Sequence, residues 1–262
     1  MERIAASQKG LAHMAMQLEV PRASTFEHDT LEKYDGIIAV SETDKQSYIQ
    51  RYQFEPERIL VLDNSVDTEY FSFRPRTHAD QPNIVFVASL GYWPNDEAAQ
   101  RLLGEIMPLV RQHVPNARAW IVGQSPSRKL LDLSNDSLNI VTGQVDDVRP
   151  FLDMAAVTCI PLRTGSGTKY KVLEAASAGV PIVCTPLALE GLSLRVDDHV
   201  LVGQSDQELA DALIQTIQDP AGRSQAVQSA AAHVEEYYSW NSNLNKLDPW
   251  LEAMQKMPKH RK

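Results

Sequence analysis

From about Pro82 onward, short apolar runs alternate with longer amphipathic segments, and this alternation constrains the fold more than any other feature. Apolar runs predict five buried strands, at 83–88, 117–122, 138–142, 157–161 and 181–185. Helical spacing of apolar residues predicts helices at 95–114, 146–154, 169–178, 207–218 and 222–237, with a last one after Asn241. Strands of this kind are typical of a parallel sheet that helices cover on both faces. Because such connections are right-handed, we expect a doubly wound, Rossmann-like α/β domain.

Glycines and small residues follow four of the expected strands, at 89–91, 123–125, 143–145 and 163–167. In an open parallel sheet these positions lie at one edge, outside the carboxyl ends of the strands, where ligands bind. We therefore expect a ligand rim at this edge, with Gly91, Val145 and Arg163 among its contacts. Tyr92 and Trp93, which also follow the first strand, are expected to form a packing pair at the start of a helix.

Composition excludes several classes of protein. The 262 residues carry a net charge of −9, which disfavours the phosphate backbone of a nucleic acid as a partner. Cys159 and Cys184 each lie in a short apolar run, which predicts buried free thiols in neighbouring strands, and no Cys/His spacing of a metal site occurs. The sequence has no signal-peptide core and no run of about 18 apolar residues, so we expect a cytoplasmic protein.

The first eighty residues predict fewer elements. Residues 31–40 indicate a helix end followed by a strand, and Ser41 is a good N-cap for a helix that runs through Tyr52. Residues 58–62 predict one more strand, and the Asp-Asn-Ser turn at 63–65 indicates a hinge. These pieces are too small for an independent core. We therefore divide the chain into a partial βα unit at 1–65, a complete domain at 66–240, and a terminal helix and basic tail at 241–262, with this helix crossing back to the partial unit.

The segment from Pro161 to Val183 carries the clearest chemistry. Gly165, Ser166 and Gly167 precede a helix, whose N-terminal amides and dipole suit a diphosphate. Thr168 adds a hydroxyl donor, and Lys169 and Lys171 add positive charge. Lys171 and Glu174 lie three residues apart on one helix face, where a cation and a carboxylate can meet one ligand. Tight strand-to-helix packing would explain the glycines alone equally well, and a solvated surface pair would explain Lys171 and Glu174.

The whole string GTKYKVLEAASAGVPIV at 167–183, followed by Glu190-Gly191-Leu192, resembles the donor-site signature of family 4 glycosyltransferases, which have the GT-B fold. The resemblance extends in order to IAVS at 38–41, DNSVD at 63–67, VTGQVDDVR at 141–149 and YSW at 238–240, and so covers residues 26–255. It implies that this chain supplies the nucleotide-sugar donor half of such an enzyme, with only part of the acceptor half.

The resemblance also implies roles for particular residues. Glu174 matches the glutamate that binds the nucleotide's ribose, whereas Ser166 stands where the family's other glutamate would contact the sugar. The stretch 89–95 lacks the Arg and Lys with which the family clamps the diphosphate, so Arg163 and Lys169 are candidates to replace them. The loop 143–145 matches the one whose backbone recognises the base.

The implied function is sugar transfer from a nucleotide diphosphate-sugar to an unknown acceptor, either a glycan or a lipid-linked glycan, as in polysaccharide biosynthesis. The resemblance implies a retaining outcome without a protein nucleophile, metal or other cofactor, and it leaves the catalytic residues unassigned. A separate chain is expected to supply the remaining acceptor domain. Two alternatives stay open. One is a non-catalytic nucleotide-sugar-binding module or inactive transferase, and the other is an epimerase on the same architecture.

Overall fold

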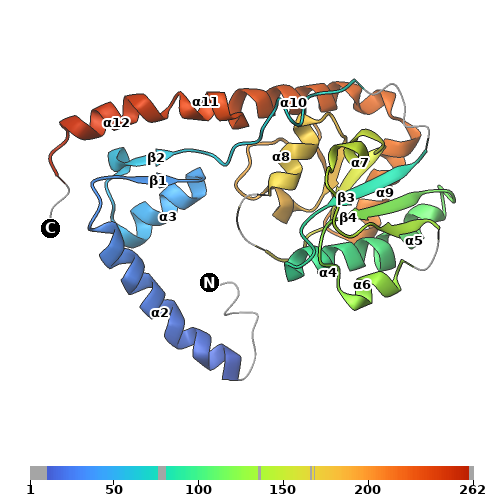
Figure 1. The fold of residues 1–262 in the computed structure, drawn as a ribbon, viewed down its shortest axis with the longest axis horizontal. Helices are drawn as coiled ribbons and strands as arrows, with labels where there is room; N and C mark the ends of the chain where they lie inside the picture. The colour runs from blue at the N-terminus through green and yellow to red at the C-terminus, as the bar shows by residue number, and fades with distance from the viewer. Residues whose placement is uncertain (1–10, 76–80, 135–136, 166, 168, 260–262) are drawn as a thin grey trace. The chain divides into compact units, whose positions relative to one another are not determined.

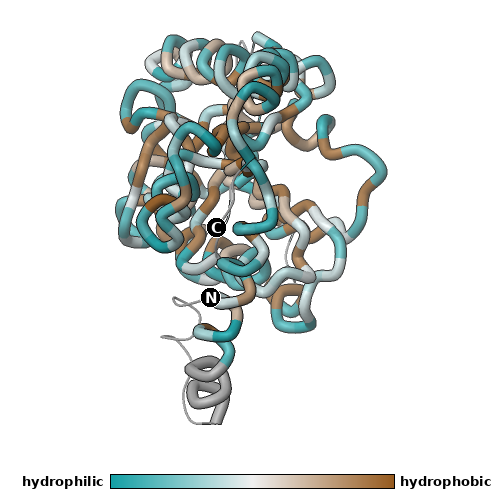
Figure 2. The backbone as a smooth tube through the Cα atoms, turned by 90° about the vertical axis from the view of Figure 1, so that its left-hand side faces the viewer, coloured by the Kyte–Doolittle hydropathy of each residue, from teal (hydrophilic) through white to brown (hydrophobic). Residues whose placement is uncertain are grey.

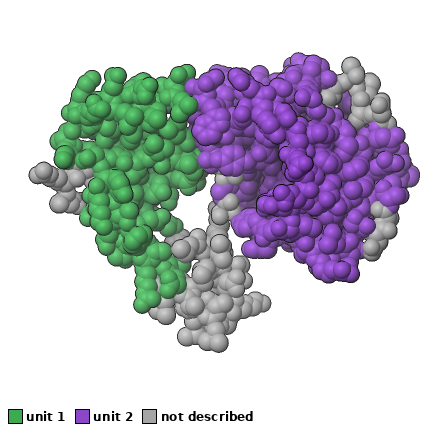
Figure 3. Space-filling view, in the orientation of Figure 1, with its two compact units in different colours: residues 1–62, 244–262 green, residues 63–243 purple. Residues whose placement is uncertain are grey.

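The computed structural model describes residues 11–75, 81–134, 137–165, 167 and 169–259. The chain forms two compact units, one of residues 1–62 with 244–262 and one of residues 63–243 (Figure 3). The sequence analysis placed the corresponding divisions after residues 65 and 240. The larger unit contains all the expected strands from Pro82 onward and the expected ligand rim.

A six-stranded parallel sheet forms the centre of the larger unit, and its strand order is β5-β4-β3-β6-β7-β8 (Figure 1). The strands are β3 (Asn83–Val87), β4 (Arg118–Val122), β5 (Asn139–Val141), β6 (Val157–Ile160), β7 (Ile182–Cys184) and β8 (Leu201–Val202). This sheet confirms the predicted doubly wound parallel fold. The sequence analysis did not predict β8, because two residues of sheet edge leave no recognisable apolar run.

Helices cover both faces of this sheet (Figure 1). One layer holds α4 (Trp93–Arg101), α5 (Met107–Arg111), α6 (Arg128–Asp132) and α9 (Asp206–Gln218). The other holds α7 (Arg149–Asp153), α8 (Tyr170–Ser177) and α10 (Ser224–Tyr238), in which α10 packs against α8. Short 3₁₀ turns lie at Pro186–Leu189 and Ala221–Arg223.

The expected single helix over 95–114 is wrong in its middle. A π-helical segment, Leu102–Ile106, separates α4 from α5. Pro108 explains the interruption, because it has no N–H to donate to the carbonyl of Gly104 and its ring crowds that turn. The expected helix over 146–154 is likewise shortened to α7, since the Asp147 carboxylate accepts a hydrogen bond from the Arg149 backbone N–H at 2.9 Å and forms a turn before it.

The central strands supply the core, as their hydropathy suggests (Figure 2). Ile84, Val85 and Phe86 of β3 are fully buried. Cys159 and Cys184 are buried free thiols in the neighbouring strands β6 and β7, as predicted. Burial raises the pKa of Cys184 to about 12 and that of Cys159 further, so neither thiol ionises at neutral pH. These cysteines therefore act as small core residues.

The smaller unit contains α2 (Leu11–Leu31), β1 (Ile37–Ala39), α3 (Glu42–Tyr52), a 3₁₀ turn (Pro56–Arg58), β2 (Ile59–Val61) and α12 (Leu247–Lys256), and α11 (Trp240–Leu244) joins it to the larger unit. The strands β1 and β2 are parallel. Ser41 caps α3 as predicted, since its side chain accepts a hydrogen bond from the Asp44 N–H at 3.1 Å.

Buried Arg58 ties the end of the chain to this unit. It donates hydrogen bonds to the carbonyl oxygens of Asp35 at 3.0 Å and Pro258 at 2.7 Å. Residues that follow Leu244 therefore pack with the N-terminal elements, as the sequence analysis expected for the terminal helix. Within the described ranges, no helix combines the length and the apolar character that a bilayer span requires.

Candidate functional site

The candidate site lies where the connections of the sheet change direction. From β3 the chain crosses through α4 to β4 on one side, whereas from β6 it crosses through α8 to β7 on the other. The carboxyl ends of β3 and β6 are neighbours, so the loops that follow them diverge and leave a crevice. Crevices at such switch points are where doubly wound sheets bind their ligands.

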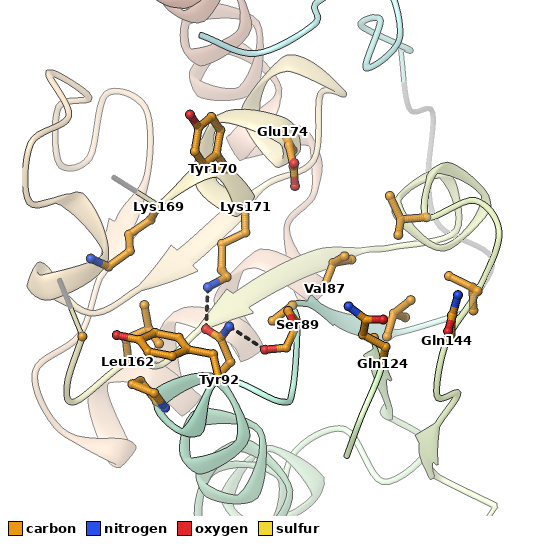
Figure 4. Close-up of a pocket in the computed structure, with 18 of the residues that line it drawn as sticks. Val87, Ser89, Tyr92, Gln124, Gln144, Leu162, Lys169, Tyr170, Lys171 and Glu174 are labelled. Carbon is orange, nitrogen blue, oxygen red and sulfur yellow. Dashed lines mark hydrogen bonds between the residues drawn. The ribbon is translucent and has the colours of Figure 1, made fainter. Parts of the chain in front are cut away.

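A cavity of about 630 Å³ occupies this crevice (Figure 4). All four segments of the predicted rim contribute to its wall, and the contributing residues include Ser89, Gly123, Gln124, Gln144, Val145, Thr164 and Gly165. Tyr92, Asn95, Lys169, Lys171 and Glu174 complete the polar part of the wall. Among the other predicted contacts, Gly91, Arg163 and Gly167 are not part of it. Ser166 and Thr168 lie outside the described residues.

A close backbone approach shapes the floor of this cavity. The Ala88 N–H donates to the Val122 carbonyl at 2.9 Å, and the Leu90 N–H donates to the Gln124 carbonyl at 3.0 Å. These bonds continue the pairing of β3 and β4 beyond the strands. A Cβ on Gly123 would lie 1.7 Å from the carbonyl oxygen of Ala88, so only glycine fits between the two loops.

Helix α8 carries two of the predicted polar contacts. Figure 4 shows the side chains of Lys171 and Glu174 extending on the same side of this helix, whereas Lys169 points away from them. The Glu174 carboxylate makes no hydrogen bond or ion pair with any residue that the structure describes. The predicted juxtaposition of one cation and one carboxylate at the cavity wall is therefore present.

The electrostatics of the cavity follow from burial. Burial, with the nearby positive charge of Lys169, lowers the pKa of Lys171 from its ordinary 10.5 to about 8, and Glu174 opposes this shift. Burial also raises the pKa of Glu174, and Lys171 opposes that shift. Both groups thus lack the solvation that an exposed charge has, and an anion near Lys171 would restore part of its stabilisation.

Lys171 is held by a residue from the opposite wall. Its Nζ donates a hydrogen bond to Oδ1 of Asn95 at 2.7 Å, and Nδ2 of Asn95 donates to the carbonyl oxygen of Ser89 at 2.8 Å (Figure 4). The Lys171 Nζ also lies 5.7 Å from the centroid of the Phe86 ring, a distance typical of a cation–π contact. Asn95 thus connects the end of β3 to α8.

Arg163 is directed to carboxylates outside the cavity wall. Its guanidinium lies 2.7 Å from Glu105 Oε2, 3.1 Å from Asp206 Oδ2 and 3.6 Å from Glu97 Oε1. These neighbours raise the pKa of Arg163 and compensate its charge. The structure therefore does not bring Arg163 together with Lys171 and Glu174.

Sequence reasoning missed Asn95 and misjudged Tyr92 and Trp93. The side chains of Tyr92 and Trp93 are 47% and 61% exposed, so the expected packing pair is wrong. The Tyr92 hydroxyl instead approaches Gly165, where it would lie 3.8 Å from an added Cβ. The signal for Asn95 was its place two residues into a helix that follows a rim loop, where an amide can bond the loop's carbonyl.

Residues 81–219 match the family model described as Glycosyl transferases group 1, and the chain belongs to this family. One of the relatives belongs to the phosphatidylinositol N-acetylglucosaminyltransferase of Homo sapiens. It is 27% identical over 216 residues, which cover 79% of this chain and 43% of that protein. Phosphatidyl-myo-inositol mannosyltransferase of Mycobacterium leprae is 26% identical over 215 residues, covering 79% and 56% respectively. The chain thus spans about half the length of these relatives.

Solved structures show the same fold. A mutant of S. aureus TarM, in complex with ligands that include UDP, superposes with a TM-score of 0.72 at 14% identity, covering 90% of this chain and 47% of TarM. HepE from Anabaena, in complex with UDP and glucose, gives a TM-score of 0.68 at 14% identity, covering 89% of this chain and 67% of HepE. The GT-B type of fold expected from the sequence is confirmed.

Proposed function

We propose that the cavity at the switch point binds the nucleoside diphosphate part of a nucleotide-sugar, and that the protein transfers the sugar to an acceptor. The observation that carries this proposal is the pair Lys171 and Glu174, which present a half-buried cation and a carboxylate to one cavity. The family and the UDP complexes of TarM and HepE support the same class of ligand.

In this proposal the diphosphate lies between Lys171 and the loop before α8. The ammonium of Lys171 has donors beyond the one used by Asn95, and the N-terminus of α8 adds backbone amides and a positive dipole end. The Thr164 hydroxyl is buried, lines the cavity and has no hydrogen-bond partner among the described residues, so it suits a phosphate oxygen. Ser166, Gly167 and Thr168 remain proposed contacts of this loop.

We assign the ribose to Glu174. A carboxylate accepts hydrogen bonds from two hydroxyl groups and repels a phosphate, which makes it a selective partner for a ribose. Its raised pKa reflects burial without a compensating donor, and hydroxyl donors of a ligand would supply one. The base would then lie toward the loops after β4 and β5, where Gln124, Gln144 and Val145 line the wall.

The transfer itself requires that the bond between the sugar's anomeric carbon and the diphosphate oxygen breaks. The electron pair goes to the diphosphate, an acceptor hydroxyl oxygen bonds the anomeric carbon, and that hydroxyl loses its proton. Lys171 and the α8 amides would stabilise the charge that develops on the departing diphosphate. We propose a retaining outcome, in which no protein nucleophile attacks the sugar.

The acceptor would meet the sugar at the open side of the cavity. We propose a glycan or a lipid-linked glycan as the acceptor, and the relatives named above for acting on phosphatidylinositol support the lipid-linked choice. A domain supplied by a separate chain is our proposal for the acceptor surface. Transfer by this chain alone, with no second chain added, would contradict that part of the proposal.

Thermal unfolding with added nucleotides tests the binding step. A ligand at about 100 times its dissociation constant adds about 2.7 kcal/mol to stability. For a unit of this size that corresponds to a rise in melting temperature of roughly 5–10 °C. We expect such a rise with at least one of UDP, GDP, ADP, TDP and CDP. The absence of a shift with all five would overturn the proposal.

A further inference from the structure

We propose that Asn95 is a positioning residue that fixes the Lys171 ammonium at the diphosphate end of the cavity. This inference rests on the proposed function. Asn95 is buried, with 7% of its surface exposed, and belongs to the first turn of α4, while Lys171 belongs to the first turn of α8. The two helices follow β3 and β6, the strands that flank the switch point.

The orientation of the Asn95 amide is determined by its two partners. The Ser89 carbonyl oxygen can only accept a hydrogen bond, so it faces Nδ2 of Asn95 at 2.8 Å. The Lys171 ammonium can only donate, so it faces Oδ1 at 2.7 Å. Turning the amide over would place donor against donor and acceptor against acceptor. Oδ1 is therefore held toward Lys171 by the backbone at the end of β3.

This arrangement compensates for the flexibility of a lysine. A lysine side chain has about 2 kcal/mol of rotamer entropy and its ammonium is a point charge without a preferred plane. A fixed acceptor on the opposite wall restricts the ammonium to one place and leaves its other N–H groups for a ligand. Preorganisation of this kind increases affinity because less freedom is lost when the ligand binds.

The charged neighbours of Lys171 set the sign of the test. The other charged side chains that line the cavity are Lys169, which lowers the pKa of Lys171, and Glu174, which raises it. An anion binds the protonated ammonium, so affinity for UDP should fall as the pH rises through the pKa of Lys171 in the free protein. Removing the Oδ1 acceptor destabilises the protonated form and should move this midpoint down, whereas a carboxylate at the same place should move it up.

The experiment measures the affinity for UDP, or for whichever nucleotide binds best, across pH with Asn95→Ala, Asn95→Asp and Lys171→Met. We expect Asn95→Ala to weaken binding about tenfold near neutral pH, with the pH midpoint moved down. Asn95→Asp should move the midpoint up. In the Lys171→Met background, Asn95→Ala should have no further effect on affinity, because the residue it positions is absent.

Asn83→Ala is the matched control for folding. Asn83 is also 7% exposed, lies at the other end of β3, and makes two side-chain hydrogen bonds, with Met154 O at 3.2 Å and Trp120 Nε1 at 3.1 Å. It should lose stability without moving the pH midpoint. Equal losses from Asn95→Ala in the wild-type and Lys171→Met backgrounds, or an unmoved midpoint, would overturn the positioning role. Wild-type protein that binds no nucleotide would instead overturn the proposed function.

Discussion

The carbonyl oxygen of Ala88 lies 1.7 Å from the position that a Cβ on Gly123 would occupy. This relationship joins the residue after β3 to the residue after β4, and backbone hydrogen bonds on either side of it keep the two segments paired. The close approach brings the two loops into one wall, so that Ser89 and Gln124 line the same cavity. The architecture of the candidate site therefore depends on a missing side chain.

Gly123→Ala should destabilise the protein by about 3 kcal/mol or more, because a methyl group cannot fit unless the paired loops separate. Denaturant unfolding measures this loss. Gly104→Ala is the control, since a Cβ there meets nothing within 4 Å and the residue lies in a helical segment. It should be neutral or stabilising by up to about 1 kcal/mol. Similar losses for both variants would contradict the account of Gly123.

A buried ion pair links α4 to α9. The Arg101 Nε lies 2.5 Å from Asp206 Oδ1, the Arg101 side chain is 3% exposed, and it also donates to the Pro161 carbonyl at 2.9 Å. Asp206→Asn leaves this arginine buried without its carboxylate and should cost about 2 kcal/mol. Asp198→Asn, which breaks the exposed pair with Arg195, should change the free energy of unfolding by less than about 0.5 kcal/mol. A loss as small in Asp206→Asn would show that the buried pair adds nothing.

Stability should depend on pH through Lys171. Its folded pKa of about 8 lies below the ordinary 10.5, so between these values the unfolded chain holds a proton that the folded protein has lost. The free energy of unfolding of the wild type should therefore rise relative to Lys171→Met, by roughly 2 kcal/mol between pH 8 and pH 10. Lys129→Met, on exposed α6, should run parallel to the wild type. Parallel profiles for Lys171→Met as well would contradict the lowered pKa.

Glu174 should confer preference for a ribose. Loss of a hydroxyl partner for a buried carboxylate leaves that carboxylate unpaired, so the wild type should bind UDP at least about tenfold more tightly than 2′-deoxy-UDP. In Glu174→Ala the two affinities should converge, while Glu252→Ala, exposed on α12, should keep the wild-type ratio. Isothermal titration of both nucleotides measures the ratio. An undiminished preference in Glu174→Ala would place the ribose elsewhere.

The strands of the larger unit could be predicted because parallel strands buried on both faces must be apolar throughout, as Ile84, Val85 and Phe86 are. The rim could be predicted because parallel strands end at one edge. The interruption at Leu102–Ile106 could not, because the effect of Pro108 on a helix depends on whether the surrounding packing tolerates a π-helical turn.

Side-chain partners that are far apart in the sequence were the least predictable part of the site. Arg163 is adjacent to the glycine loop, but the carboxylates that hold it are Glu105, 58 residues away, and Asp206, 43 residues away. Asn95 and Lys171 are separated by 76 residues and meet only because the sheet places β3 beside β6. Local patterns predict which face a residue occupies, whereas the fold decides which charges compensate one another.

The most direct test of the central claim compares the affinities of UDP and uridine for the wild type and for Lys171→Met, or of the corresponding pair if another base binds best. If the cavity holds a diphosphate against Lys171, the wild type should bind UDP far more tightly than uridine. Lys171→Met should reduce this difference by about 1–2 kcal/mol, the contribution of one charge-assisted contact, and leave uridine affinity unchanged. A UDP-to-uridine difference that is the same in both proteins would contradict the assignment of the diphosphate to this cavity.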